Sequence, residues 1–189
     1  RQIAGAMKSG RSVTLVASGA IGAGIGELAL AKRPKTMPML QAAAAVGQGQ
    51  LMRTFHDVFA ACGVKVAQVL LTRDDFDERT RYLNIRNTLS ALNECGALPI
   101  VNENDTVAVD EIRFGENDIL AALVTNMTGA DLLVLLTSVD GVMKGADVLD
   151  VATPDAGIAV DNILVTNDPD FVPRGRGQVP EDLAAEPQG

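Results

Sequence analysis

Helical patterns of apolar residues give way to continuous apolar runs at four glycines along this chain. The pairs are Gly10 with residues 13–17, Gly63 with residues 64–71, Gly96 with residues 98–101, and Gly129 with residues 132–136. Glycine just past a helix supplies the left-handed cap, and a strand that is apolar throughout is typical of burial on both faces. The pattern therefore predicts an α/β fold in which these four strands lie parallel in one sheet covered by helices.

Between these strands, periodic segments predict helices over residues 39–61, 77–94 and 118–127. The composition changes from about residue 151, because the last 39 residues hold five of the eight prolines, and seven acids against two arginines. Within that part only residues 157–160 and 163–165 have the character of strands. The sequence thus predicts a folded domain over residues 1–150 and a divergent, largely flexible C-terminal tail over residues 151–189.

Charge and hydropathy narrow the class of function. The 189 residues include 16 Lys plus Arg and 24 Asp plus Glu, and the net charge of −8 argues against nucleic acid and anionic membranes as partners. No apolar run reaches the ~20 residues that span a bilayer, and the first residues do not form a signal peptide. We expect a cytoplasmic protein that binds a small metabolite.

Two Glu-Asn-Asp groups stand close together, at residues 103–105 and 116–118, with a further asparagine before the first. The first group follows a predicted strand, and ligands of open α/β sheets collect outside the carboxyl ends of strands. The second group opens a predicted helix, whose N-terminus favours anions. Turns and helix caps also use Asn and Asp, but two such groups exceed that need. We therefore expect a site for an amino acid or a small dicarboxylate.

A glycine-rich turn follows the first predicted strand, from Ser18 to Gly26. A strand that runs into such a turn and then into a helix places backbone N–H groups and a hydroxyl around an anion. For residues 22–26, tight helix packing is the alternative, and the dinucleotide fingerprint is excluded because no acid lies about 20 residues further on. At the end of the fourth strand, Thr137 and Ser138 either contact a nucleotide or only form a turn.

Seven motifs, in order from about residue 13 to residue 150, resemble the glutamate 5-kinases of the amino acid kinase family. They are Val16-Ala-Ser-Gly-Ala-Ile21, Ala43-Ala-Ala-Val-Gly-Gln48, Gln68-Val-Leu-Leu-Thr-Arg73, Tyr82-Leu-Asn-Ile-Arg86, Val101-Asn-Glu-Asn-Asp105, Gly115-Glu-Asn-Asp118 and Leu135-Leu-Thr137. The resemblance implies a three-layer αβα sandwich with a mainly parallel sheet. It implies an enzyme that uses ATP and Mg²⁺ to convert L-glutamate to glutamyl 5-phosphate, the first step of proline biosynthesis. It also implies self-association as dimers or tetramers.

The same resemblance assigns the site residues. In that family the Ser-Gly-Ala turn and the Asn and Asp of the two groups hold glutamate, a further Asp organises the reaction centre, and a Thr-Asp pair contacts the nucleotide. The matching residues here are Ser18, Gly19, Ala20, Asn102, Asp105 and Asn117 for glutamate, Asp118 for catalysis, and Thr137 with Ser138 for the nucleotide. Ser138 stands where the family commonly has Asp, and no side chain is assigned to a metal.

Two lysine-bearing segments of the family pattern are not found in the sequence. One is an initial strand with Lys-(Leu/Val)-Gly-(Thr/Ser), and the other is Gly-Thr-Gly-Gly-Met followed by a lysine. Because such groups neutralise the transferred phosphoryl group, we expect a partial kinase domain, truncated at both ends and impaired in activity. Another acylphosphate-forming kinase of this fold, such as one acting on acetylglutamate, is an alternative. A non-catalytic amino-acid-binding or subunit-interaction protein is another.

Overall fold

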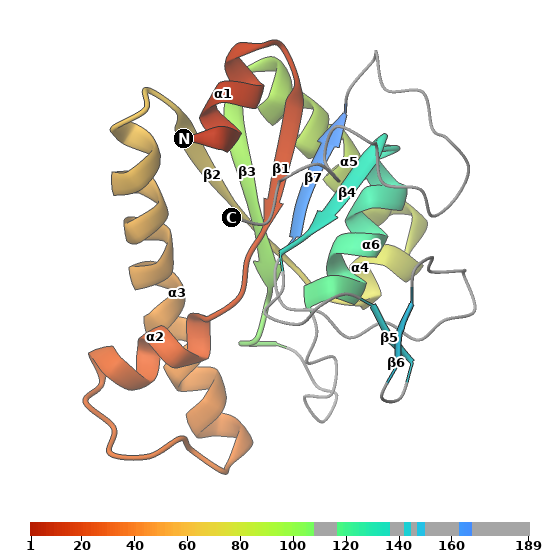
Figure 1. Cartoon of the computed structure of the whole chain (residues 1–189). Helices are drawn as coiled ribbons and strands as arrows, with labels where there is room; N and C mark the ends of the chain where they lie inside the picture. The colour runs from red at the N-terminus through yellow and green to blue at the C-terminus, as the bar shows by residue number, and fades with distance from the viewer. Residues whose placement is uncertain (108–116, 137–141, 145–146, 150–162, 168–189) are drawn as a thin grey trace.

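The computed structural model describes residues 1–107, 117–136, 142–144, 147–149 and 163–167, in which helices and strands alternate (Figure 1). The helices are α1 (Gln2–Lys8), α2 (Ala20–Glu27), α3 (Met37–Ala60), α4 (Asp74–Asp77), α5 (Arg79–Glu94) and α6 (Asn117–Thr128). The strands are β1 (Ser12–Val16), β2 (Lys65–Leu71), β3 (Ala97–Glu103), β4 (Leu132–Leu135), β5 (Val142–Lys144), β6 (Asp147–Leu149) and β7 (Ile163–Asn167). The chain is an α/β protein, as predicted.

Five strands form one sheet in the order β2-β3-β1-β7-β4, and β5 pairs with β6 in a separate antiparallel ribbon. β2, β3 and β1 are parallel, with Lys65 opposite Ala97 and Val16 opposite Val101. β7 is antiparallel to both β1 and β4, so β4 points the same way as β1. The four strands predicted to be parallel are therefore parallel and share one sheet. β7, which was not predicted to join them, lies between two of them.

Helices cover both faces of this sheet, and two apolar cores result (Figure 1). Alternate residues of a strand point to opposite faces, so a strand with helices on both sides is apolar throughout. The core toward α1 and α3 contains Val13, Leu15, Ala17, Phe59, Leu98 and Ile100. The core toward α5 and α6 contains Val16, Leu71, Leu89, Val101, Leu120, Ala121, Val124 and Met127. The predicted three-layer αβα arrangement is confirmed.

The helix ends follow the predicted glycines, with one difference. Gly10, Gly63, Gly96 and Gly129 have φ values of 91°, 74°, 66° and 66°, the left-handed region that a C-terminal cap needs. The helix expected over residues 77–94 is α5, which begins at Arg79, and the short helix α4 precedes it. The break occurs because Glu78 is extended and its carboxylate accepts hydrogen bonds from the N–H groups of the first turn of α5.

The division of the chain at residue 150 stays a prediction. β7 comes from the segment beyond that residue and pairs along its whole length with β1. The strand expected over residues 157–160 lies outside the described residues.

α2 and the first part of α3 lie beyond the carboxyl end of the sheet (Figure 1), where the two helices cross at a pair of glycines. A Cβ at Gly24 would lie 1.7 Å from the carbonyl oxygen of Ala43, and a Cβ at Gly47 would lie 1.8 Å from that of Ala20. No side chain fits at either place, so the two backbones are in direct contact. The packing alternative for the glycine-rich turn therefore holds at Gly24.

Candidate functional site

The carboxyl end of β1 leads directly into the turn Ser18-Gly19-Ala20. Ala17 continues the strand pairing, because its N–H donates to the carbonyl of Val101 at 2.8 Å. Gly19 has a φ of 104°, where an L side chain is strained, and immediately precedes α2. Ser18 is exposed while Ala20 is buried. An accessible hydroxyl thus lies next to the N–H groups that the first turn of a helix leaves unbonded.

Asn117, in the second Glu-Asn-Asp group, is bonded to this turn. Its Nδ2 donates to the carbonyl oxygen of Ala17 at 2.9 Å, across 100 positions of sequence. Asn117 is the first residue of α6, and the next residue, Asp118, is buried with 4% of its surface exposed. The structure therefore brings the Ser18 turn and the start of α6 together at the end of β1.

The first Glu-Asn-Asp group follows β3, the neighbour of β1 in the sheet. The N–H of Asn104 donates to the carbonyl of Leu71 at 2.8 Å, and its own carbonyl accepts from Val107 at 3.1 Å. Its Oδ1 also accepts from the hydroxyl of Thr106 at 2.6 Å. The first bond extends the pairing of β3 with β2, and the other two are local to the connection that leaves the sheet. Asn104 therefore forms the turn, which is the alternative to a binding role.

Glu103 and Asp105 flank that asparagine with half-buried carboxyl groups. Burial raises the pKa of Glu103 to about 6, and the neighbouring Asp105 carboxylate contributes to the rise. Burial also raises the pKa of Asp105, while the guanidinium of Arg33 lowers it. A carboxylate that is partly removed from water gains from a cationic partner, so Asp105 is suited to pair with an ammonium group.

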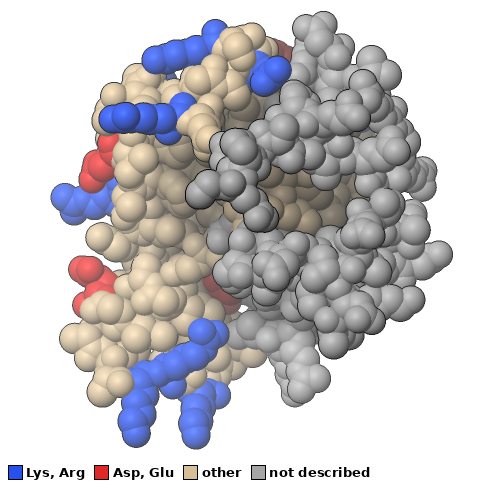
Figure 2. All heavy atoms as spheres, in the orientation of Figure 1, with Lys and Arg blue, Asp and Glu red and all other residues tan. Residues whose placement is uncertain are grey.

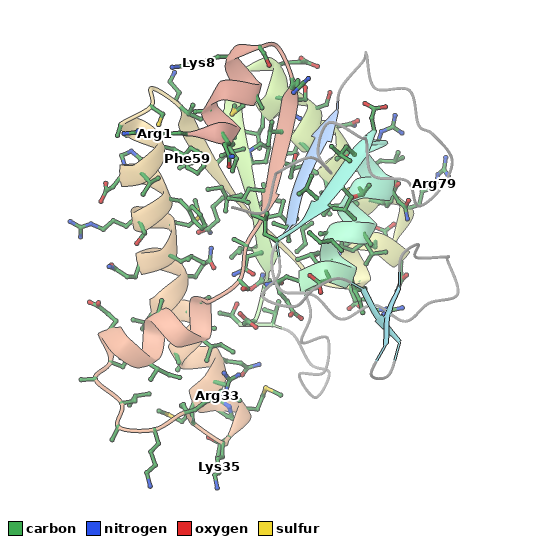
Figure 3. The ribbon with its side chains drawn as sticks, viewed as in Figure 1. Arg1, Lys8, Arg33, Lys35, Phe59 and Arg79 are labelled. Atoms are coloured by element: carbon green, nitrogen blue, oxygen red, sulfur yellow. The ribbon has the colours of Figure 1, made fainter. Side chains whose placement is uncertain are left out.

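Basic side chains gather at the end of the molecule where α2 is connected to α3 (Figure 2). Arg33 and Lys35 lie in this connection (Figure 3). Their charge is opposite to the net charge of −8 of the whole chain. Local positive charge beside a site attracts anionic ligands and raises their rate of association.

A small pocket lies between the ends of β2 and β3 and the start of α6. Its lining consists of Leu71, Thr72, Arg73, Phe76, Glu103, Asn117, Leu120 and Leu123. Apolar walls with a few polar groups are typical of small-molecule sites. Asn117 is the predicted site residue that lines this pocket.

Comparison with known proteins shows the family of this chain. The family model described as "Amino acid kinase family" matches residues 1–159. The chain belongs to the amino acid kinase family.

Its similarity to individual members is also high. A glutamate 5-kinase of Syntrophotalea carbinolica is 54% identical over 141 residues, which are 75% of this chain and 38% of the relative. One of Moorella thermoacetica is 56% identical over 141 residues, 75% of this chain and 37% of the relative. One of Clostridium acetobutylicum is 55% identical over 141 residues, 75% of this chain and 53% of the relative. The chain thus spans only part of the length of these relatives.

The structure places some of the predicted site residues near one another, and others lie outside the described residues. Asn117 is bonded to Ala17, the residue before Ser18, at the end of β1, and Asn102 and Asp105 lie at the end of the adjacent β3. Thr137 and Ser138 lie outside the described residues, so their nucleotide contacts stay a prediction. In the described part of the chain, no group of three or more His, Cys, Asp or Glu residues is arranged to hold a metal ion. None of the helices there is long and apolar enough to cross a membrane.

Two residues of this kinase domain were not predicted from the sequence. Arg33 affects the charge of Asp105 from the α2–α3 connection, and Gln48 of α3 accepts a hydrogen bond from Asn102. Gln48 lies within the motif at residues 43–48, which was the one signal that pointed to it. A basic residue in a loop carries no such signal.

Proposed function

We propose that this chain carries the glutamate site of an ATP-dependent kinase that phosphorylates the side-chain carboxylate of L-glutamate to glutamyl 5-phosphate, the first step of proline biosynthesis. The hydrogen bond from Asn117 to Ala17 carries the proposal, because it joins the start of α6 to the exposed Ser18 turn. The 54% to 56% identity with proteins named glutamate 5-kinase supports it.

Glutamate has two carboxylates and one ammonium group, and the site offers complementary groups. We assign a carboxylate to the Ser18 hydroxyl and the N–H groups at the start of α2, since helix N-termini bind anions. Gly19 and Ala20 supply that backbone. The half-buried carboxylate of Asp105 is assigned to the ammonium group, and Asn117 lines the adjoining pocket with its carboxamide. Asn102 belongs to the same site from beneath, where it is 3% exposed.

The proposed reaction needs no general base. An oxygen of the side-chain carboxylate, already ionised at neutral pH, attacks the γ-phosphorus of ATP, the bond to the β–γ bridging oxygen breaks, and ADP leaves. The protein contributes mainly position and charge. Asp118, buried at the N-terminus of α6, is proposed to organise the reaction centre. Thr137 and Ser138 are proposed to contact the nucleotide.

The Mg²⁺ of the reaction is proposed to arrive with ATP. Kinases usually hold this ion with one or two carboxylates and the substrate phosphates, rather than with a cage of protein ligands. When bound, Mg²⁺ neutralises charge on the phosphates.

The proposal includes a cytoplasmic location, where glutamate and ATP are abundant, and association with further copies of the same chain. It includes neither nucleic acid nor a membrane among the partners, in line with the net charge of −8.

Calorimetric titration of the purified chain tests the substrate. L-Glutamate should bind with a Kd no weaker than about 1 mM, the upper end of common KM values, whereas N-acetyl-L-glutamate should give no heat. Glutamate-dependent ADP release in the presence of ATP and Mg²⁺ tests the reaction. Tighter binding of N-acetyl-L-glutamate than of L-glutamate would exclude the proposed substrate.

A further inference from the structure

α3 contacts both of the turns assigned to glutamate, and it does so with two consecutive residues. Gly47 lies against the carbonyl of Ala20, at the end of the Ser18 turn. Gln48 accepts a hydrogen bond from Nδ2 of Asn102 at 2.9 Å, at the end of β3. These turns are far apart in sequence, so this short part of α3 is a common support for them.

The hydrogen bond between Asn102 and Gln48 belongs to a series of amide hydrogen bonds that all run in the same donor-to-acceptor direction. The N–H of Glu103 donates to Oδ1 of Asn102 at 2.9 Å, and Nδ2 of Asn102 donates to Oε1 of Gln48. Nε2 of Gln48 then donates to Oε1 of Gln68 on β2 at 3.3 Å. Hydrogen bonds aligned head to tail polarise and strengthen one another in a buried setting.

The side chains in the middle of this series of hydrogen bonds are buried. Gln48 is 8% exposed and Asn102 is 3% exposed, so water does not replace a lost partner readily. Oδ1 and Nδ2 of Asn102 are both bonded within the protein. Its side chain therefore lies under the site and orients the Glu103 N–H and the turn that follows, which carries Asp105.

We propose that Gln48 is a positioning residue for the amino acid substrate. It fixes Asn102, which in turn fixes the backbone from Glu103 to Asp105, while Gly47 holds the Ser18 turn at the matching place. This inference rests on the proposed glutamate site and adds to it a residue that does not touch the substrate.

The test compares two glutamines of α3 in the full chain. Gln48→Met keeps the length of the side chain and removes both hydrogen bonds, and it should raise the Kd for L-glutamate about 10- to 100-fold, as expected when buried amides lose their partners. Gln50→Met, at an exposed position two residues away, should leave the Kd within about twofold, the usual effect of a surface change. Circular dichroism establishes that each variant is folded.

A double variant separates positioning from general damage. If Gln48 acts through Asn102, then Gln48→Met combined with Asn102→Ala should bind glutamate no more weakly than Asn102→Ala alone. Additive losses, or a Kd for Gln48→Met within about twofold of the wild type, would overturn the inference. If Gln48→Met does not fold, Gln68→Met, at an exposed position of β2, removes only the last hydrogen bond of the series, from Nε2 of Gln48. It should weaken glutamate binding in the same direction but by less, and an unchanged Kd there counts against the inference.

Hydrogen exchange gives a readout that does not depend on glutamate. The amide of Glu103 should exchange faster in Gln48→Met than in Gln50→Met. If the wild-type chain fails to bind glutamate, the proposed function is wrong. If, in addition, the Glu103 amide exchanges at the same rate in the two variants, the positioning role of Gln48 is wrong as well.

Discussion

Replacing Gly47 with alanine should force α2 and α3 apart. The new Cβ would lie 1.8 Å from the carbonyl oxygen of Ala20 and 2.3 Å from the nitrogen of Gly24, both of them backbone atoms that cannot rotate away. Because Cβ contacts under 3.0 Å essentially never occur, the helices must separate by about 1 Å or more. Such overpacking costs about 3 kcal/mol, at the upper end of its usual range. The higher helix propensity of alanine offsets about 1 kcal/mol of this.

Gly49 provides the matched control, since it lies two residues further along α3 and nothing lies within 4 Å of a Cβ built there. Gly49→Ala gains the same helix propensity without the overlap. The difference between the two variants therefore isolates the cost of the overlap, which we expect to be about 3 kcal/mol. Urea unfolding followed by far-UV circular dichroism measures both free energies.

Equal free energies of unfolding for Gly47→Ala and Gly49→Ala would refute this reasoning. That result would mean that the two helix backbones do not meet at Gly47, and the support that α3 gives to the Ser18 turn would lose its basis.

Three further outcomes are expected. Asn117→Ala should weaken the binding of glutamate by about 1–3 kcal/mol and leave the binding of ATP unchanged. Asn126→Ala, at an exposed asparagine of the same helix, should change the binding of neither ligand. Equal losses of binding for both ligands in calorimetry would indicate that Asn117 is a structural cap. NMR titration should place the midpoint of Glu103 near its pKa of about 6. Because the folded state binds this proton more tightly, the group makes the protein less stable as pH rises from 4.5 to about 6, and Glu103→Gln should remove that part of the pH dependence of urea unfolding. Leu89→Ala, at a position with 0% exposure, should cost about 2–5 kcal/mol in the same assay, and Leu83→Ala on the exposed side of α5 much less.

Local patterns predicted most of the fold. The four glycines after helices were readable because a left-handed cap is a property of one residue and its neighbours. The apolar strands were readable because burial on both faces removes every polar position. The short helix α4 and its separation from α5 at Glu78 were not predicted, since glutamate is an unusual N-cap and its cap depends on bonds to Thr80 and Arg81.

Tertiary contacts were beyond the reach of those patterns. A polar residue such as Gln48 in an alanine-rich helix is indistinguishable by composition from one that faces water, and only the approach of Asn102 from β3 gives it a role. The pocket beside Asn117 likewise requires the ends of β2, β3 and α6 in one place. Resemblance to a family supplied the site residues, whereas the residues beneath the site came from packing.

β7 has a consequence for the order in which the sheet is built during synthesis. Its partners differ greatly in sequence distance, because Leu132 pairs with Thr166 while Ser12 pairs with Asn167. Closing the longer loop costs roughly 1 kcal/mol more in chain entropy, and contacts of such long range slow folding. The ribosome synthesises β1, β2 and β3 before β7. Until β7 is made, the backbone groups of β1 that pair with β7 in the folded chain lack that partner. Open edges of this kind are templates for pairing with other chains, so we expect a neighbouring nascent copy to compete with β7 for the same row of hydrogen bonds.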